Sequence, residues 1–251
     1  MLKIRIMPTL LHKDLGLVKG VGFDSWRRAG GAMQAVKLYN MREVDELLFL
    51  DITATRDKRQ PDYELIDDLA DECFMPLAVG GGVGCIDDVR RLLMVGADKV
   101  VVNTAAVDRP EIVAEIAGRF GSQCLVVSID ARRRADGGHE VYVESGTRPT
   151  GLDPVVLAQR VAAEGAGEIL ITSIERDGTM EGYDLDLLRA VAEAVPVPVI
   201  ASGGAGNYRH LAEALEAGAS AVAAASIFHF TEQTPREAKR YLGERGFPVR
   251  L

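Results

Sequence analysis

The sequence is poor in the residues that mark secreted, membrane-spanning and metal-binding proteins. Its three cysteines, Cys73, Cys85 and Cys124, show no CxxC spacing, so we expect neither a complete disulfide framework nor a metal site. No apolar run reaches the roughly 18 residues of a transmembrane helix, and the N-terminus lacks the apolar core of a signal peptide. These absences predict a soluble, cytoplasmic protein that uses no metal or cofactor and has no membrane partner.

An excess of positive charge is also missing. The chain has 29 Lys and Arg against 37 Asp and Glu, which gives a formal net charge of −8. This balance argues against nucleic acid as the main partner. The local basic cluster from Arg132 to Arg134 is too small to change that and is expected to be a solvated turn.

What the sequence does contain is an internal repeat. Residues 76–106 and 198–228 both read as an apolar run, a glycine turn, a helical pattern that ends at glycine, and a second apolar run. Gly81 and Gly203 are 122 residues apart, and so are Asn103 and Ala225. A repeat of about half the chain suggests a duplicated half-domain.

Strand and helix patterns alternate along the whole chain, eight of each. This predicts a parallel sheet closed as a (β/α)8 TIM barrel, one domain over 1–251 with half-barrels at roughly 1–121 and 122–251. A doubly wound open sheet fits less well, because the spacing is regular and no GxGxxG follows the first strand. Residues 11–31 are too long for an ordinary connection and are expected to be a functional loop or lid. The segment 132–147 looks like a β-hairpin insert. Strands are expected at 4–10, 46–52, 76–79, 99–102, 124–129, 168–172, from 198 and at 221–224.

Active sites of such barrels lie at the carboxyl ends of the strands. Glycines there expose backbone N–H groups, and small hydroxyls add donors, which suits a phosphate dianion. Two glycine turns half a barrel apart therefore predict an elongated bisphosphate ligand. The residues at the expected strand ends are Asp51, Gly80 to Gly82, Asn103, Thr104, Asp130, Thr172, Ser173, Gly203, Gly204, Ala225 and Ser226.

Three carboxylates near these ends are candidates for chemistry. Asp130 stands where a general acid or base would be useful, although a strand-end carboxylate also commonly caps a loop. Asp51 has the same two interpretations. Asp177, beside Gly178, either orders the loop after the sixth strand or contacts substrate.

The opposite end of the barrel carries charges at four strand starts. Arg5, Glu46, Lys99 and Glu168 are two cations and two anions that can form a neutral ring across the axis. Buried charges are costly unless paired. The pattern alone favours a salt-bridged plug over a gate on an axial passage.

At these residues the chain resembles the cyclase subunit of imidazole glycerol phosphate synthase, the HisF family. The segments that carry the resemblance cover nearly the whole chain and include LLFLDITAT, VGGGV, GADKVVVNTAAV, RFGSQCLVVSIDAR, GAGEILITSIERDGTMEGYDL, PVIASGGAGN and AAASIFHF. The resemblance implies a barrel that docks a HisH-type glutaminase on its bottom face and passes ammonia up the axis to a phosphorylated ribulosyl intermediate.

The resemblance also assigns residues. It turns the ring of Arg5, Glu46, Lys99 and Glu168 into an ammonia gate and makes Asp98 a docking residue. Asp130 is its catalytic carboxylate, and Lys19 matches a lysine of the substrate loop. The phosphate sites it implies comprise Gly82, Asn103 and Thr104 on one side and Asp177, Gly178, Gly204, Ala225 and Ser226 on the other.

One departure bears on the activity. The family's first strand ends in Pro-Cys-Leu-Asp, whose Asp is the second catalytic carboxylate, whereas here Pro8-Thr9-Leu10 is followed by Leu11. Leucine cannot transfer a proton. A carboxylate that acts as general acid or base typically raises the rate by a factor of about 10² to 10⁴. Asp14 lies three residues further along the loop, in a different place.

The departure resembles a HisF-like branch associated with amidination of surface-glycan sugars, as do residues 40–47 and 72–77, while residues 228–250 resemble the histidine-pathway enzyme. The leading hypothesis is therefore an amidination-type paralogue. The alternatives are the histidine-pathway cyclase with an altered site, and a binding module that holds a bisphosphate or regulates its partner without chemistry of its own. A HisA-type isomerase fits less well, because it also needs a strand-one carboxylate.

Overall fold

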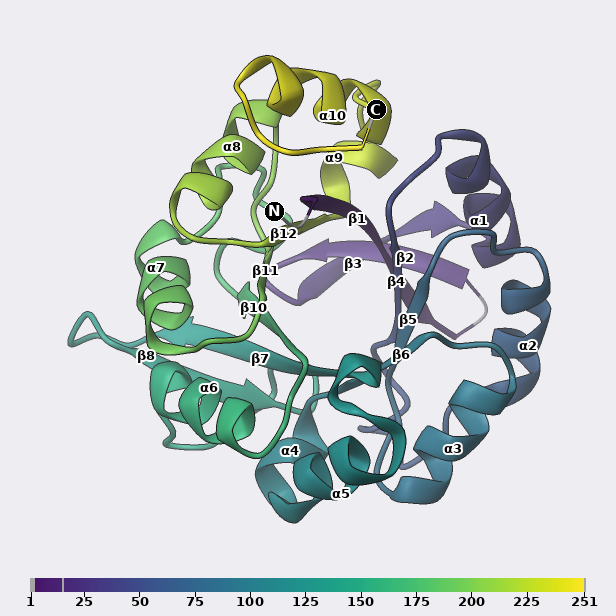
Figure 1. Ribbon diagram of the computed structural model, residues 1–251, viewed down its shortest axis with the longest axis vertical. Coiled ribbons are helices and arrows are strands. Elements are labelled where there is room, and N and C mark those ends of the chain that lie inside the picture. The colour runs from purple at the N-terminus through teal and green to yellow at the C-terminus, as the bar shows by residue number, and fades with distance from the viewer. Residues whose placement is uncertain (1–2, 15, 251) are drawn as a thin grey trace.

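The computed structural model describes residues 3–14 and 16–250, and these form a closed eight-stranded parallel barrel surrounded by helices (Figure 1). The predicted (β/α)8 barrel is therefore confirmed. Its strands, in chain order, are β1 (Arg5–Lys13), β4 (Leu47–Asp51), β5 (Leu77–Gly80), β6 (Lys99–Val102), β7 (Leu125–Arg133), β10 (Glu168–Ser173), β11 (Val199–Ser202) and β12 (Ala221–Ala224). Each strand pairs in parallel with its neighbours, and pairing of β7 with β10 and of β12 with β1 completes the ring.

The helices lie outside the strands and pack an apolar face against them. Several begin at the caps that the sequence offers: Asp153 accepts a hydrogen bond from Val155 N, and Thr234 forms a capping box with Glu237. The helices are α1 (Ala32–Met41), α2 (Tyr63–Asp71), α3 (Ile86–Met94), α4 (Thr104–Asp108), α5 (Glu111–Phe120), α6 (Pro154–Ala163), α7 (Leu185–Ala194), α8 (Tyr208–Glu216), α9 (Ser226–His229) and α10 (Pro235–Glu244), with a 3-10 turn, η1 (Ser122–Cys124), before β7.

The core has two parts because strand side chains alternate between the two faces of the sheet. Residues such as Ile6 and Leu10 face outward into the large layer beneath the helices. The inward-facing residues form a smaller cluster on the barrel axis: Met7, Leu48, Ala78, Val101, Val126, Leu170, Ile200, Ala221 and Ala223.

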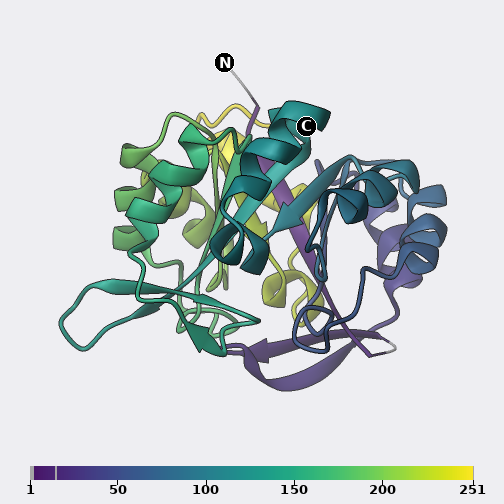
Figure 2. The ribbon, with the colours of Figure 1, turned by 90° about the horizontal axis from the view of Figure 1, so that it is seen from below.

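Two antiparallel ribbons extend the barrel at one end, opposite the two termini (Figure 2). The first is formed by β1, β2 (Gly16–Val21) and β3 (Asp24–Gly30), so the stretch expected to be a loop is largely strand; residue 15 lies outside the described residues. The second is formed by β7, β8 (His139–Val143) and β9 (Arg148–Pro149), which confirms the expected hairpin insert. The eight predicted strands are the barrel strands, and the ribbons add β2, β3, β8 and β9 to them.

The two halves of the barrel match closely in their element bounds. α1, β5, α3 and β6 recur 122 residues later as α6, β11, α8 and β12, each with the same length. The turn glycines match as well: Gly81 and Gly82 have φ of 104° and 75°, and Gly203 and Gly204 have φ of 85° and 113°.

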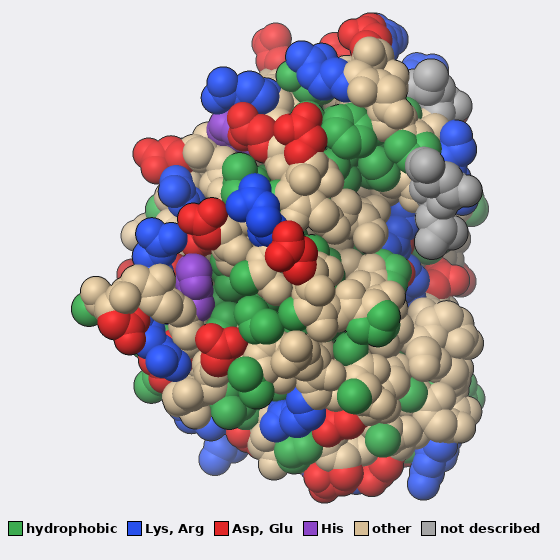
Figure 3. Space-filling view, turned by 60° about the vertical axis from the view of Figure 1, so that its left-hand side comes forward, with side chains coloured by type: hydrophobic (Ala, Val, Ile, Leu, Met, Phe, Trp, Pro, Cys, Tyr) green, Lys and Arg blue, Asp and Glu red, His purple; other side chains and the backbone are tan. Residues whose placement is uncertain are grey.

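The outer surface over α7 and α8 mixes charges of both signs (Figure 3). Many are paired along one helix, as Arg209 is with Glu213 at 3.3 Å. Within 3–14 and 16–250, no helix is long and apolar enough to cross a membrane.

Candidate active site at the mouth of the barrel

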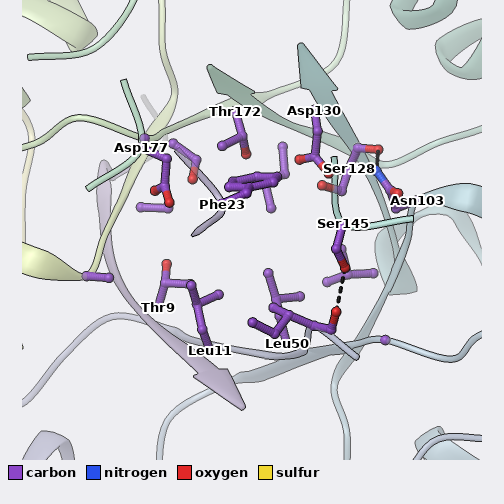
Figure 4. Close-up of a pocket in the computed structure, with 18 of the residues that line it drawn as sticks. Thr9, Leu11, Phe23, Leu50, Asn103, Ser128, Asp130, Ser145, Thr172 and Asp177 are labelled. Atoms are coloured by element: carbon purple, nitrogen blue, oxygen red, sulfur yellow. Dashed lines mark hydrogen bonds between the residues drawn. The ribbon is translucent and has the colours of Figure 1, made fainter. Parts of the chain in front are cut away.

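The carboxyl ends of the barrel strands surround one open pocket, which the two ribbons border (Figure 4). Of the mouth residues predicted from the sequence, all but Gly80 and Ser173 line this pocket, although they come from loops far apart in the chain. The lining residues are Lys19, Asp51, Gly81, Gly82, Asn103, Thr104, Asp130, Thr172, Asp177, Gly178, Gly203, Gly204, Ala225 and Ser226. The four residues predicted to form a ring lie at the other end of the barrel.

Asp130 is the carboxylate best placed for proton transfer. It lies near the end of β7, is 9% exposed and points into the pocket (Figure 4). Burial raises its pKa to about 7 with help from the charge of Asp177, against hydrogen bonds from Thr172, Ser128 and Asn103 that lower it. Asn103 Nδ2 donates to Asp130 Oδ2 over 3.2 Å. A carboxyl group that titrates near neutrality can both give and take a proton at physiological pH.

Leu11 occupies the position in the first half that Asp130 occupies in the second. Leu11 pairs with Leu50 across β1 and β4, and Asp130 pairs with Thr172 across β7 and β10. Leu50 and Thr172 are themselves 122 residues apart. One side of the mouth is therefore polar and ionisable, while the matching side is aliphatic.

The two glycine turns sit on opposite sides of the pocket in similar conformations. A Cβ on Gly81 would stand 2.2 Å from Asp51 O, and one on Gly204 would stand 2.1 Å from Gly182 O, so neither turn has space for a side chain. Thr104 and Ser226 follow the next strand in each half. The amide of Gly82 donates to Thr55 Oγ1 at 3.2 Å, which adds Thr55 to this side.

The first ribbon is fastened to the far side of the mouth. Lys19 of β2 forms a buried ion pair and hydrogen bond with Asp177, and Gly22 N donates to Asp177 O at 2.8 Å. At the turn between β2 and β3, Phe23 reaches into the pocket (Figure 4). The sequence left open whether Asp177 orders its loop or contacts substrate; it does hold this ribbon against the loop.

The second ribbon is fastened in the same way to the first half. Ser145, between β8 and β9, donates from Oγ to Ile52 O at 2.5 Å (Figure 4), and Glu144 N donates to Thr104 Oγ1 at 3.1 Å. Each half thus sends one ribbon across the mouth to a loop of the other half.

The ring at the bottom of the barrel is closed by four ion pairs. Arg5 lies 2.6 Å from Glu46 and 3.0 Å from Glu168, and Lys99 lies 2.9 Å from Glu46 and 3.1 Å from Glu168. Glu46 is the most buried member, at 1% exposure. Each cation pairs with both anions, so the predicted ring forms, and its charges are neutralised pairwise.

Two other predicted residues have clear structural partners. The carboxylate of Asp51 accepts hydrogen bonds from Thr53 N, Thr53 Oγ1 and Ala54 N at 2.9 to 3.0 Å, so it caps its own loop while lining the pocket. Asp98 is exposed just before β6, and its Oδ2 accepts from Leu77 N at 2.8 Å.

Several pocket residues were missed as site candidates. Thr9 and Ser128 precede Leu11 and Asp130 by two positions, so the period-2 alternation of strands would have found them. Leu50 follows from register with Leu11. Nothing in the local sequence marks Ser145 as a pocket residue, because it reaches the pocket only through the path of the second ribbon.

A closed (β/α)8 barrel with its polar residues gathered at the carboxyl ends of the strands belongs to the barrel class that carries its site at this face. Within that class, a family model described as "Histidine biosynthesis protein" matches residues 5–234, and the chain belongs to this family. Its members are usually enzymes.

Proposed function

We propose that this barrel is the HisF-type synthase subunit of a glutamine amidotransferase. In this proposal a HisH-type glutaminase docks on the bottom face, and the ammonia that it releases travels up the barrel axis to a phosphorylated substrate at the mouth. The observation that carries the proposal is the closed ring of Arg5, Glu46, Lys99 and Glu168 directly beneath an apolar axis.

The axis above the ring suits a small neutral molecule. Its lining is apolar and combines the short side chains of Ala78, Ala221 and Ala223 with larger ones such as Met7 and Leu170. Apolar walls admit ammonia more readily than ammonium, because burying an unpaired charge is costly. Lys99 holds two of the four ring contacts, so rotation of this side chain would open the ring.

The bottom face offers a surface for the glutaminase. Asp98 is exposed there, and two large apolar side chains at the same end are also exposed, Phe74 at 85% and Met94 at 78%. The loop that presents Phe74 is held by Asn40, whose side chain bonds Glu72 O at 2.5 Å and Phe74 N at 3.0 Å. Exposed apolar residues on a supported loop are typical of protein interfaces.

Leu11 supports a paralogue rather than the histidine-pathway cyclase. The cyclase reaction of the family uses two carboxylates facing each other across the mouth, and only Asp130 of that pair is acidic here. We therefore propose that the ammonia serves amidination of a sugar in surface-glycan biosynthesis, carried out with a separate amidotransferase. The runner-up is the cyclase subunit of imidazole glycerol phosphate synthase, and the raised pKa of Asp130 favours it, because that group suits proton transfer.

Docking can be tested with the HisH-type glutaminase encoded by the same genome. Sedimentation velocity should show a heterodimer with wild-type barrel, and glutamine hydrolysis should rise at least about tenfold on binding. Phe74→Ser and Asp98→Lys should weaken the complex. Val156→Ser is the matched control, because Val156 is 59% exposed but lies at the start of α6, away from the bottom face. Separate sedimentation of wild-type barrel and glutaminase would reject the proposal.

A further inference from the structure

The hydroxyl of Thr9 is a buried polar group whose hydrogen-bonding capacity is unused. Thr9 is 6% exposed, and its Oγ1 has no hydrogen-bond partner among residues 3–14 and 16–250. The side chain lines the mouth pocket, and its oxygen points into it (Figure 4). Buried hydroxyls are normally paired, so an unpaired one in a pocket indicates a ligand atom as its partner.

Comparison with the other half explains why this hydroxyl is unpaired. Thr9 pairs with Leu48 and Ser128 pairs with Leu170, so Thr9 and Ser128 are counterparts. Ser128 lies two residues before Asp130 on the same face of its strand, and its hydroxyl helps to lower the pKa of that carboxyl group. The residue two positions beyond Thr9 is Leu11, which can neither donate nor accept.

The backbone around Thr9 leaves the side chain in place. The carbonyl oxygen of Thr9 is hydrogen-bonded to His229 Nε2 at 3.1 Å, and Pro8 pairs with Ala224 of β12. The hydroxyl is thus held next to β12, which is followed by Ala225 and Ser226 on the side of the mouth where the phosphate site is predicted.

We propose that Thr9 Oγ1 hydrogen-bonds an oxygen of a sugar phosphate, a hydroxyl or carbonyl on the carbon chain close to the phosphoryl group. The phosphoryl group would lie at Gly204 and Ser226, and the C–H surface of the sugar's carbon chain would contact Leu11. This inference rests on the proposed function for the phosphate site and adds a residue that distinguishes a sugar phosphate from phosphate alone.

The test compares two probes by isothermal titration calorimetry, inorganic phosphate and D-ribulose 5-phosphate. Thr9→Val removes the hydroxyl and keeps the branched shape. We expect it to weaken binding of the sugar phosphate about tenfold while leaving inorganic phosphate unchanged. Thr9→Ser should restore most of the sugar-phosphate affinity. If Thr9→Val folds poorly, Thr9→Ala serves for the same comparison.

Thermal unfolding without ligand provides a second readout. Removing a hydroxyl that stabilises the fold lowers the melting temperature, whereas removing one that only awaits a ligand should raise it. Thr9→Val should raise the melting temperature, because it removes a buried hydroxyl without a partner. Ser128→Ala should lower it, because it removes a hydroxyl that favours the charged form of Asp130. Equal loss of affinity for both probes, or unchanged affinity for the sugar phosphate, would overturn the assignment. Failure of wild-type protein to bind either probe would reject the phosphate site itself and this inference with it.

Discussion

Leu11 and Asp130 are counterparts in the two halves of the barrel, and they differ completely in chemistry. Each lies on a strand that continues into a ribbon, and each pairs with the equivalent residue of the next parallel strand, Leu50 or Thr172. Asp130 is surrounded by hydrogen-bond donors, whereas Leu11 and Leu50 make the facing side of the pocket aliphatic. We expect this difference to decide which proton transfers the mouth supports.

Replacing Leu11 with Asp should create proton-transfer chemistry. A carboxylate at this position would face Asp130 across the mouth, and two such groups can divide acid and base roles between them. We expect Leu11→Asp to raise ammonia-dependent turnover of the phosphorylated ribulosyl substrate at least about tenfold over wild type. The assay uses purified barrel with an ammonium salt at alkaline pH and follows the absorbance of the substrate.

Adding Asp130→Asn to the Leu11→Asp variant is the control for that gain. The amide keeps the shape and the hydrogen bond to Asn103 but cannot exchange a proton, so the gain should disappear. A wild-type rate that already equals that of an ordinary cyclase would contradict the role given to Leu11 and would favour the histidine-pathway alternative.

The pKa of Asp130 also makes stability depend on pH. In the unfolded chain an aspartate titrates near pH 4, whereas in the fold burial and Asp177 raise the pKa of Asp130 to about 7. Between these values the folded state binds more protons than the unfolded state, so the free energy of unfolding falls as pH rises. The contribution is complete below about pH 4 and is lost as pH passes through about 7.

Asp130→Asn should remove this dependence. In urea titrations the variant should gain stability relative to wild type as the pH is raised from acidic to mildly alkaline values. Asp67→Asn, a change at an exposed carboxylate on α2, corrects for the loss of one negative charge. Parallel pH profiles for wild type and Asp130→Asn would show that the carboxyl group titrates normally.

The sequence specified the barrel well because its signals are local and repeated. The expected strands at 99–102 and 221–224 match β6 and β12 to the residue, since each is an apolar run between a helix-ending glycine and a polar residue or turn. The first strand was predicted too short. β1 continues to Lys13 because β2 pairs with it there, and such pairing between segments is invisible to a local pattern.

The candidate site was predictable where it depended on strand ends and unpredictable where it depended on the ribbons. Asp130 follows from its place at the end of a predicted strand, and Asn103 and the glycine turns follow from the repeat. The turn at Gly22 and Phe23 escaped detection because Phe23 has φ of 64°, a conformation that phenylalanine rarely adopts and that no turn motif signals. That Leu11 and Asp130 occupy equivalent positions could be recognised only from the strand register of the structure.

Gly204→Ala should abolish one anion site and leave the other. The new methyl group would meet Gly182 O at 2.1 Å, and the φ of 113° is unfavourable for alanine. Crystals grown with phosphate should lose density beside Ser226 and keep it beside Gly82 and Asn103. Gly246→Ala is the control, because its φ of 84° imposes similar strain with no atom within 4 Å of the new Cβ. Wild-type crystals with density at neither place would contradict the two-site assignment.

Lys99→Ala should uncouple the two activities of the complex while the barrel stays folded. Loss of this side chain leaves Glu46 and Glu168 paired through Arg5 alone, so the ring no longer closes around the axis. The ratio of glutamate formed to aminated product should rise. Arg90→Ala, which removes an exposed ion pair with Asp87 at 2.8 Å, should leave the ratio unchanged. An unchanged ratio in Lys99→Ala would make the ring a structural plug.

The most direct test of ammonia passage through the barrel follows the source of nitrogen in the product. The Leu11→Asp barrel, which is expected to turn over the phosphorylated ribulosyl acceptor, is incubated with the glutaminase, this acceptor, amide-labelled glutamine and an excess of unlabelled ammonium. Mass spectrometry then reads the label in the product after a few turnovers. Passage along the axis predicts that the product carries mostly the glutamine nitrogen despite the competing ammonium. A product labelled only in proportion to the ammonia mixed in solution would contradict the account.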